Sequence, residues 1–235
     1  NQNVRVVGQP AADQNFLLVT AGQSLNLGLG GGSLGVHLLD VILHQFLDLA
    51  YDYDKWGSHD VLNWRKWVEY FVAETFPGLD AAEKTAVEQL FIDLYDMNGK
   101  RRPEALNPSI YHPCHEGEGV RMYELGASLW QASIALYEHF AQPEKDAFYS
   151  LLHLPVKSSV NLLDMHLDSA TNAHFAAQAR PIANAYADRV AAALAALLFT
   201  ADVVMHRKRV GRTARAVTCD VIKSLLCPAR KTVTE

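Results

Sequence analysis

The chain has 235 residues and a net charge of −5 at pH 7, with 49% hydrophobic and 20% charged residues. This composition excludes a disordered chain and is typical of a globular protein with a sizeable core. The charge is unevenly spread, because residues 206–235 hold eight Lys or Arg against Asp220 and Glu235, a net +6. The first 205 residues therefore carry about −11, and we expect the basic end to differ from the rest.

Neither a secretory signal nor a membrane span is indicated by the sequence. The first fourteen residues contain no apolar run of the length that a signal peptide needs. The longest apolar run, Val190–Ala201, is too short and too rich in Ala to cross a bilayer. The three cysteines, Cys114, Cys219 and Cys227, are too few and too scattered for a disulfide framework, which leaves the compartment open.

The N-terminal region contains the best candidate for a strand, the β-branched and aromatic run Asn15–Ala21. The loop after it fits the dinucleotide-binding pattern G-x-G-x-x-G at Gly30, Gly32 and Gly35. In that pattern, backbone amides and a helix N-terminus hold a pyrophosphate. The loop before the first glycine is long for this role, and no alternating strands and helices follow. A chance match is therefore favoured over a nucleotide site.

From residue 36 onward, apolar residues recur every three to four positions, which predicts helices rather than strands. A first helix is expected from Val36 to about Tyr51. The next helix stops before Pro77-Gly78, and one of its faces is apolar: Val61, Trp64, Trp67, Val68, Phe71 and Val72.

Two more helices are indicated by their ends and by their apolar faces. Asp80 and Glu83 form a capping pair for the first of them. We expect that helix to close at Asn98-Gly99 with a residue in the left-handed conformation. The second spans roughly Glu118 to Ala141.

The segment Phe148–Asp188 predicts two long helices joined near Ser169–Thr171. The first is apolar on two sides, which places it in the middle of a bundle. Pro155 and Pro181 are expected inside these helices, where each removes an amide donor and favours a kink. The one polar stripe of the first helix is expected to face solvent: Lys157, Asn161, Asp164 and Asp168.

Together these patterns predict an all-α protein, a helical bundle of about six helices with one short strand and a Gly-rich loop at its N-terminal end. We expect a divergent N-terminal segment over residues 1–35, a helical bundle domain over 36–199 and a divergent basic tail over 200–235.

The turn Met97–Glu104 is the best candidate for a binding role. It places Lys100, Arg101 and Arg102 beside a helix C-terminus, where the helix dipole favours cations. Two arginines there can hold a carboxylate through forked hydrogen bonds. A solvated basic turn is the simpler interpretation.

No metal, cofactor or nucleic acid is indicated. His112, Cys114, His115 and Glu116 are metal-capable, but their spacing matches no structural zinc pattern and no second ligand pair occurs elsewhere. The basic tail has no aromatic residues between its charges and no recognised nucleic-acid-binding module.

Four separated blocks of the sequence resemble glycoside hydrolase family 115, whose members are α-glucuronidases that act on xylan. They occur in the family's order over roughly two thirds of the chain: FLDLAYDYDKWG at Phe46–Gly57, YDMNGKRRPEALNPSIY at Tyr95–Tyr111, FYSLLHLPVKSSVNLLDM at Phe148–Met165 and AAQARPIANAYADRV at Ala176–Val190.

The resemblance implies that the chain is the helical domain that follows a catalytic (β/α)8 barrel. The family cleaves the α-1,2 bond between (4-O-methyl)glucuronic acid and xylose with inversion, which uses two carboxyl groups about 6.5–9.5 Å apart. Catalytic side chains of barrels lie at the C-terminal ends of strands. Only a remnant of the last strand is expected here, at residues 15–21, so we expect no catalytic residue and no activity of the chain alone.

Both ends depart from the family pattern. Thr20 and Gln23 stand where the family has Asn and Asp, and the sequence after about Phe199 does not resemble it. We therefore expect a fragment with divergent ends.

The resemblance also implies partners. These are a xylan or glucuronoxylan oligosaccharide, whose uronic acid Asn98, Arg101 and Arg102 are suited to contact, and a homodimer through the helical domain. Export of the parent enzyme is left open. Two alternatives remain: a free-standing helical interaction or dimerisation module, and a dinucleotide-binding protein through Gly30–Gly35.

Overall fold

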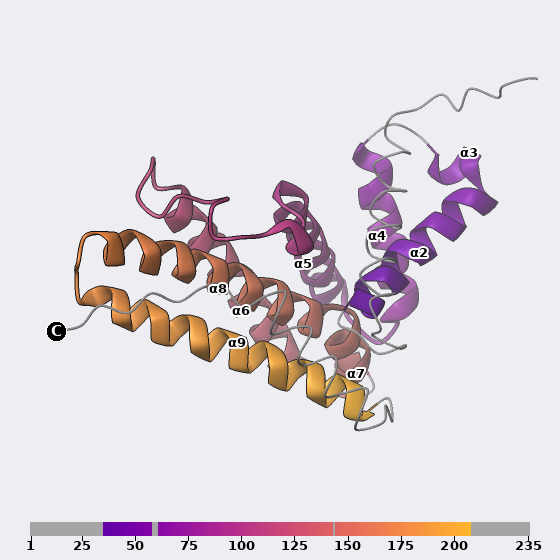
Figure 1. The fold of residues 1–235 in the computed structure, drawn as a ribbon. Helices are drawn as coiled ribbons and strands as arrows, with labels where there is room; N and C mark the ends of the chain where they lie inside the picture. Colours follow the sequence, from indigo (N-terminus) through magenta and orange to yellow (C-terminus); the bar gives the residue numbers. More distant parts are fainter. Residues whose placement is uncertain (1–34, 58–60, 143, 208–235) are drawn as a thin grey trace, which may run out of the picture.

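The computed structural model describes residues 35–57, 61–142 and 144–207, and every regular element in these ranges is helical, as predicted (Figure 1). The predicted strand Asn15–Ala21, the glycines Gly30 and Gly32 and the basic tail beyond residue 207 lie outside the described residues. The α-helices are α2 Gly35–Tyr51, α3 Tyr53–Trp56, α4 Val61–Thr75, α5 Ala81–Lys100, α6 Glu118–His139, α7 Glu144–Phe148, α8 Leu154–Ala177 and α9 Ile182–Arg207. A 3₁₀ turn, η1, covers Pro103–Ala105, and a π turn, η2, covers Tyr149–His153.

The helices are arranged around α8. Helix α9 returns antiparallel along one side of α8, and α6 packs on another side (Figure 1). Helix α5 packs against α6, α4 packs against α5, and α2 contacts η2 and α8. This is the bundle that the helical periodicity predicts, with the predominantly apolar helix at its centre.

The main core lies between α4, α5, α6 and α8. Its aromatic centre is a run of rings in which Trp67 stacks on Phe71 at 5.1 Å and Phe71 meets Phe91 edge-on at 5.8 Å. All three side chains are buried. The indole Nε1 of Trp67 donates to a carboxylate oxygen of Asp48 at 2.9 Å, which ties α4 to α2. Stacked and edge-on rings of this kind add to the stabilisation from burial alone.

A second, smaller core joins α8 to α9. Its buried members are Leu162 and Met165 on α8 and Val190 and Leu197 on α9. The Ala-rich sequence of α9 lets the two helices approach closely, and the apolar positions recur at helical spacing as the sequence predicts.

The start of α5 is as predicted and its end is not. The side chain of Asp80 accepts from the Glu83 amide at 2.8 Å, and Glu83 accepts from the Asp80 amide at 2.7 Å, which is a capping box. The predicted left-handed cap at Asn98-Gly99 is wrong, because α5 continues through Gly99 to Lys100 and leaves at Arg101 in an extended conformation. Buried Met97 and the hydrogen bond from Asn98 to Ser159 hold this last turn in the helix.

The predicted joint near Ser169–Thr171 is also wrong. Helix α8 runs through these residues to Ala177, and the turn to α9 lies over residues 178–181. Within α8, Thr171 Oγ1 donates to the Leu167 carbonyl at 2.8 Å, and Asn172 Nδ2 donates to the Ala183 carbonyl of α9 at 2.8 Å. These side chains satisfy their polar groups inside the helix, so a stretch that is typical of a loop remains helical.

The two prolines lie at different kinds of position. Pro181 is not inside a helix but just before α9, where a missing amide donor costs little. Pro155 lies in the first turn of α8, directly after η2, in which the Leu154 amide bonds to the Tyr149 carbonyl. The wider π turn replaces a regular turn that the proline ring would have crowded. The helix is therefore distorted next to Pro155 as expected, through a π turn directly before it.

Candidate functional site

The three residues predicted to contact a substrate lie where α5 gives way to η1. Asn98 Nδ2 donates to Ser159 Oγ on α8 at 3.3 Å, and Arg101 Nε donates to the Ala105 carbonyl at 3.2 Å. Arg101 is exposed and Arg102 is half-buried. The bond through Nε restrains the plane of the Arg101 guanidinium.

Asn98 and Arg101 line one small cavity of about 10 Å³, which has room for about one water molecule and not for a sugar, and its wall does not include Arg102. The lining residues come from α5, the following loop, α6 and α8: Met97, Asn98, Arg101, Leu106, Tyr111, Met122, Ser159 and Leu163. Burial and the nearby Glu118 carboxylate raise the pKa of Tyr111, with Arg101 opposing them. The Tyr111 phenol therefore keeps its proton and can act as a hydrogen-bond donor at this wall.

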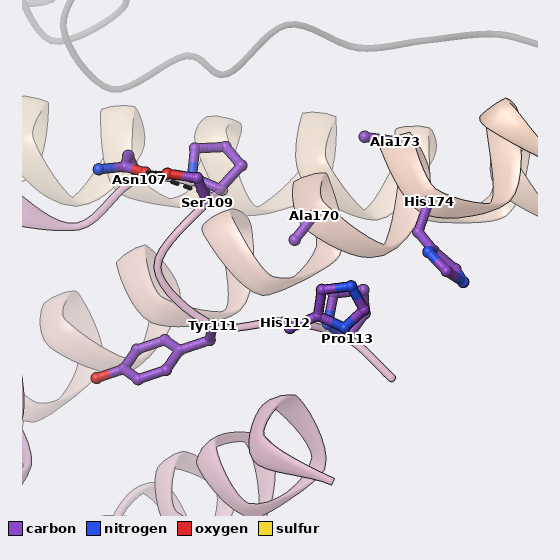
Figure 2. A pocket seen from close by; sticks show the side chains of 9 residues that line it. Asn107, Ser109, Tyr111, His112, Pro113, Ala170, Ala173 and His174 are labelled. Carbon is purple, nitrogen blue, oxygen red and sulfur yellow. Dashed lines mark hydrogen bonds between the residues drawn. The ribbon is translucent and has the colours of Figure 1, made fainter. Parts of the chain in front are cut away.

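A larger groove of about 640 Å³ lies between the loop after η1 and the second half of α8 (Figure 2). His112 from the loop and His174 from α8 meet there with ring centroids 5.7 Å apart and planes nearly perpendicular. The other lining residues are Asn107, Pro108, Ser109, Tyr111, Pro113, Ala170 and Ala173.

The loop residues considered as metal ligands have a local structural role. His112 Nδ1 accepts from the backbone amides of Cys114 and His115 at 3.1 and 2.8 Å, which assigns the ring proton to Nε2. Within the described ranges, no three His, Cys, Asp or Glu side chains gather in a way that could hold a metal ion.

A buried carboxylate links three helices. Asp168 on α8 is 2% exposed, accepts from the Tyr123 hydroxyl of α6 and accepts from Arg189 Nε of α9 at 3.0 Å. The Arg189 guanidinium also lies over the rings of Tyr123 and Tyr186, at 5.6 and 5.3 Å. The prediction that the polar stripe of α8 faces solvent is therefore wrong at Asp168, which is paired in the interior.

Asp164 lies one turn before Asp168 on the same helix. Its Oδ1 is buried and has no hydrogen-bond partner in the described structure. Burial and the neighbouring Asp168 carboxylate raise the pKa of Asp164 to about 6, and Arg189 opposes the shift. This carboxyl group therefore takes up a proton at mildly acidic pH. The signal in the sequence is the i, i+4 acid pair on an otherwise apolar helix; the partners on α6 and α9 are not readable from it.

Two buried histidines differ in their partners. His153 in η2 is hydrogen-bonded to Ser133 on α6 at 2.9 Å and stacks on Tyr137. His166 on α8 is 7% exposed, and neither ring nitrogen has a partner in the described structure. Burial lowers the pKa of both imidazoles, so both are neutral at pH 7.

The acid pair of α8 does not have the arrangement that inverting glycoside hydrolysis uses. That reaction needs two carboxyl groups on opposite sides of the bond that breaks, with room for water. Asp164 and Asp168 lie one turn apart on one helix, covered by Tyr123 and Arg189, and neither lines the groove or the small cavity. The arrangement is suited to holding helices together.

No protein-family model matches the chain, and no curated protein does. Within the residues that the structure describes, no helix has the length and apolar character required to cross a bilayer.

Proposed function

We propose that this chain is the helical domain of an α-glucuronidase that acts on glucuronoxylan, and that it supports substrate binding rather than bond cleavage. The proposal starts from the four sequence blocks that resemble glycoside hydrolase family 115. Its strongest support is that two of these blocks, Tyr95–Tyr111 and Phe148–Met165, supply seven of the eight residues that line the small cavity. Blocks separated by the whole of α6 meet at the cavity that contains Asn98 and Arg101.

The exposed Arg101 side chain at the edge of this cavity suits the carboxylate of a uronic acid that binds on the surface of the turn. Arg101 presents guanidinium donors, and the Ala105 carbonyl already fixes their plane, so little side-chain entropy is lost on binding. A carboxylate at the C-terminal end of α5 is opposed by the helix dipole. Lys100, Arg101 and Arg102 supply the positive charge that offsets this. Asn98, held by Ser159, positions the turn and is not itself needed as a donor to the sugar.

Binding is tested directly on the chain by nuclear magnetic resonance titration with a xylo-oligosaccharide bearing one 4-O-methylglucuronic acid. We expect saturable shifts in the turn after α5, and a loss of at least about tenfold in affinity for Arg101→Ala, since charge-assisted hydrogen bonds contribute about 1.5–3 kcal/mol. Arg65→Ala, at an exposed position on α4, is the matched control and should bind like the parent chain. Equal affinity of Arg101→Ala and parent would refute the assignment of the carboxylate to Arg101.

Activity separates a supporting domain from an autonomous hydrolase. We expect no release of methylglucuronic acid when the chain alone is incubated with glucuronoxylan, because the residues that line the groove and the small cavity of the described structure include no carboxyl group. In a full-length enzyme of the family, replacement of the arginines that correspond to Arg101 and Arg102 should raise KM. Hydrolysis by the chain alone would refute the proposal.

The homodimer and the dinucleotide site stay predictions. Two of the three glycines of the Gly30–Gly35 pattern lie outside the described residues, and Gly35 is the first residue of α2. Titration of the chain with NADH, followed by nicotinamide fluorescence, tests the nucleotide site. Sedimentation equilibrium over a range of chain concentrations tests the dimer.

A further inference from the structure

Large apolar side chains are uncovered where α2 ends and α3 begins. Tyr51 is 94% exposed, Tyr53 61%, Leu47 54% and Phe46 42%. They lie within eight consecutive residues, and we call these four the α2–α3 surface. Single exposed apolar residues are common, whereas a group of this size typically marks a place where another segment binds.

The same stretch is acidic. Asp52 and Asp54 are exposed beside the tyrosines, and residues 46–57 carry a net charge of −2. One basic side chain is already bound to aromatic rings at its edge, since Lys55 Nζ lies 4.4 Å from the Trp56 ring centre and 4.9 Å from that of Tyr70. A segment that alternates Lys or Arg with apolar side chains is therefore complementary to it. The identical face of a second copy would instead bring like charges together.

We propose that the basic C-terminal residues 208–235 of the same chain bind the α2–α3 surface. That segment carries seven Lys or Arg and two acidic residues, and it also contains apolar residues: Val217, Val221, Ile222, Leu225 and Leu226. The N-terminal residues 1–34 contain one Arg and one Asp, so they offer no net charge to match the acidic surface.

The segment is long enough to reach the α2–α3 surface from the end of α9. Helix α9 runs antiparallel to α8, so its end at Arg207 returns toward the start of α8 (Figure 1). Helix α2 contacts η2 and α8, and its start lies nearer to them than its end, which carries the α2–α3 surface (Figure 1). A chain segment as long as residues 208–235 can span at most about 90 Å, which makes the surface accessible to it. Because the segment is tethered, contacts that are weak individually are enough for occupancy.

The test places a photo-crosslinker in the full chain at Tyr51, as Tyr51→benzoylphenylalanine, and identifies the crosslinked peptides by mass spectrometry. We expect an intrachain product with residues 208–235. The control is Ile182→benzoylphenylalanine, at a position that is 50% exposed on α9 beside Arg180 and should not capture the basic segment. Asp54→Lys in the first variant, or 0.5 M NaCl, should lower the yield at least about fivefold, since exposed charges are screened within a few ångströms at high salt.

The proposal is overturned by a product with residues 1–34, by a product that forms only between chains, or by no product at all. Equal capture of residues 208–235 from Tyr51 and from Ile182 also overturns it, because the segment would then have no preferred surface. None of these outcomes depends on whether the chain binds a uronic acid.

Discussion

Arg189 on α9 donates through Nε to the carboxylate of Asp168 on α8 at 3.0 Å, and the carboxylate is buried while the guanidinium is half exposed. Tyr123 on α6 completes the group, so one carboxylate holds three helices. A buried charge of this kind is costly if one partner is removed, although the intact pair contributes little net stability compared with an apolar replacement.

Replacing Asp168 should therefore destabilise the bundle strongly. We expect Asp168→Ala to lower the free energy of unfolding by about 2–4 kcal/mol, because it leaves the Tyr123 hydroxyl and the Arg189 guanidinium without their acceptor. Urea denaturation followed by circular dichroism measures the change. Asp188→Ala, at an exposed carboxylate on α9, is the control and should stay within about 0.5 kcal/mol of the parent chain. Equal effects of the two substitutions would contradict the role of Asp168.

Asp164 should make stability fall as pH rises through the mildly acidic range. Its pKa is raised to about 6 in the folded chain, against about 3.9 for an unfolded Asp. Between these values the folded state holds a proton that the unfolded state has lost. The contribution of Asp164 to stability is therefore full below about pH 4, decreases as the pH rises to about 6 and is constant above it.

Asp164→Asn removes this titration and should stabilise the chain by about 1–2 kcal/mol at pH 7, allowing for partial exposure of the group. The quantity to measure is the difference in unfolding free energy between variant and parent, from urea titrations at pH 4.5, 5.5, 6.5 and 7.5. It should grow up to about pH 6 and then level off. A difference independent of pH would show that Asp164 has an ordinary pKa.

Two buried glycines of α6 should respond in opposite directions to alanine. A Cβ at Gly126 would lie 3.4 Å from Val160 Cγ1 and 3.5 Å from Leu163 Cδ2, which is ordinary contact. Gly126→Ala should therefore stabilise the chain by about 0.5–1 kcal/mol through helix propensity. A Cβ at Gly119 would lie 3.2 Å from the backbone of His112 and Pro113, so Gly119→Ala must displace the loop beside the groove and should lower the melting temperature. Melting of both variants in one buffer checks the opposite signs.

The fold was predictable because helical periodicity depends on local spacing. Trp67, Val68, Phe71 and Val72 are buried on α4 as their three-and-four spacing predicts, and Asp80 caps α5 as its distance from Glu83 predicts. Helix ends were less predictable, since they depend on contacts made far along the chain. Gly99 remains helical because of Met97 and Asn98, whose partners are on other helices.

The polar centre of the bundle could be predicted only in part. The spacing of Asp164 and Asp168 is visible in the sequence. It predicts a solvent-exposed polar stripe, because no neighbouring residue in the sequence indicates a buried partner for either carboxylate. Tyr123 lies 45 positions before Asp168 and Arg189 lies 21 after it, so the pairing exists only once three helices have packed. The cavity at Asn98 and Arg101 has the same origin, since Ser159 comes from 61 positions along the chain.

The π turn at Tyr149–His153 shifts the helical periodicity of the residues before it relative to that of the residues after it. A π turn holds one residue more than a regular turn, and one residue corresponds to a rotation of about 100° around a helix axis. The face that α7 presents is therefore out of phase with the face that α8 would present by simple extrapolation. Deleting one residue from η2 would make α7, η2 and α8 one regular α-helix. The resulting rotation of α7 would move Phe148 away from Phe140, with which it now makes an edge-on contact at 5.1 Å.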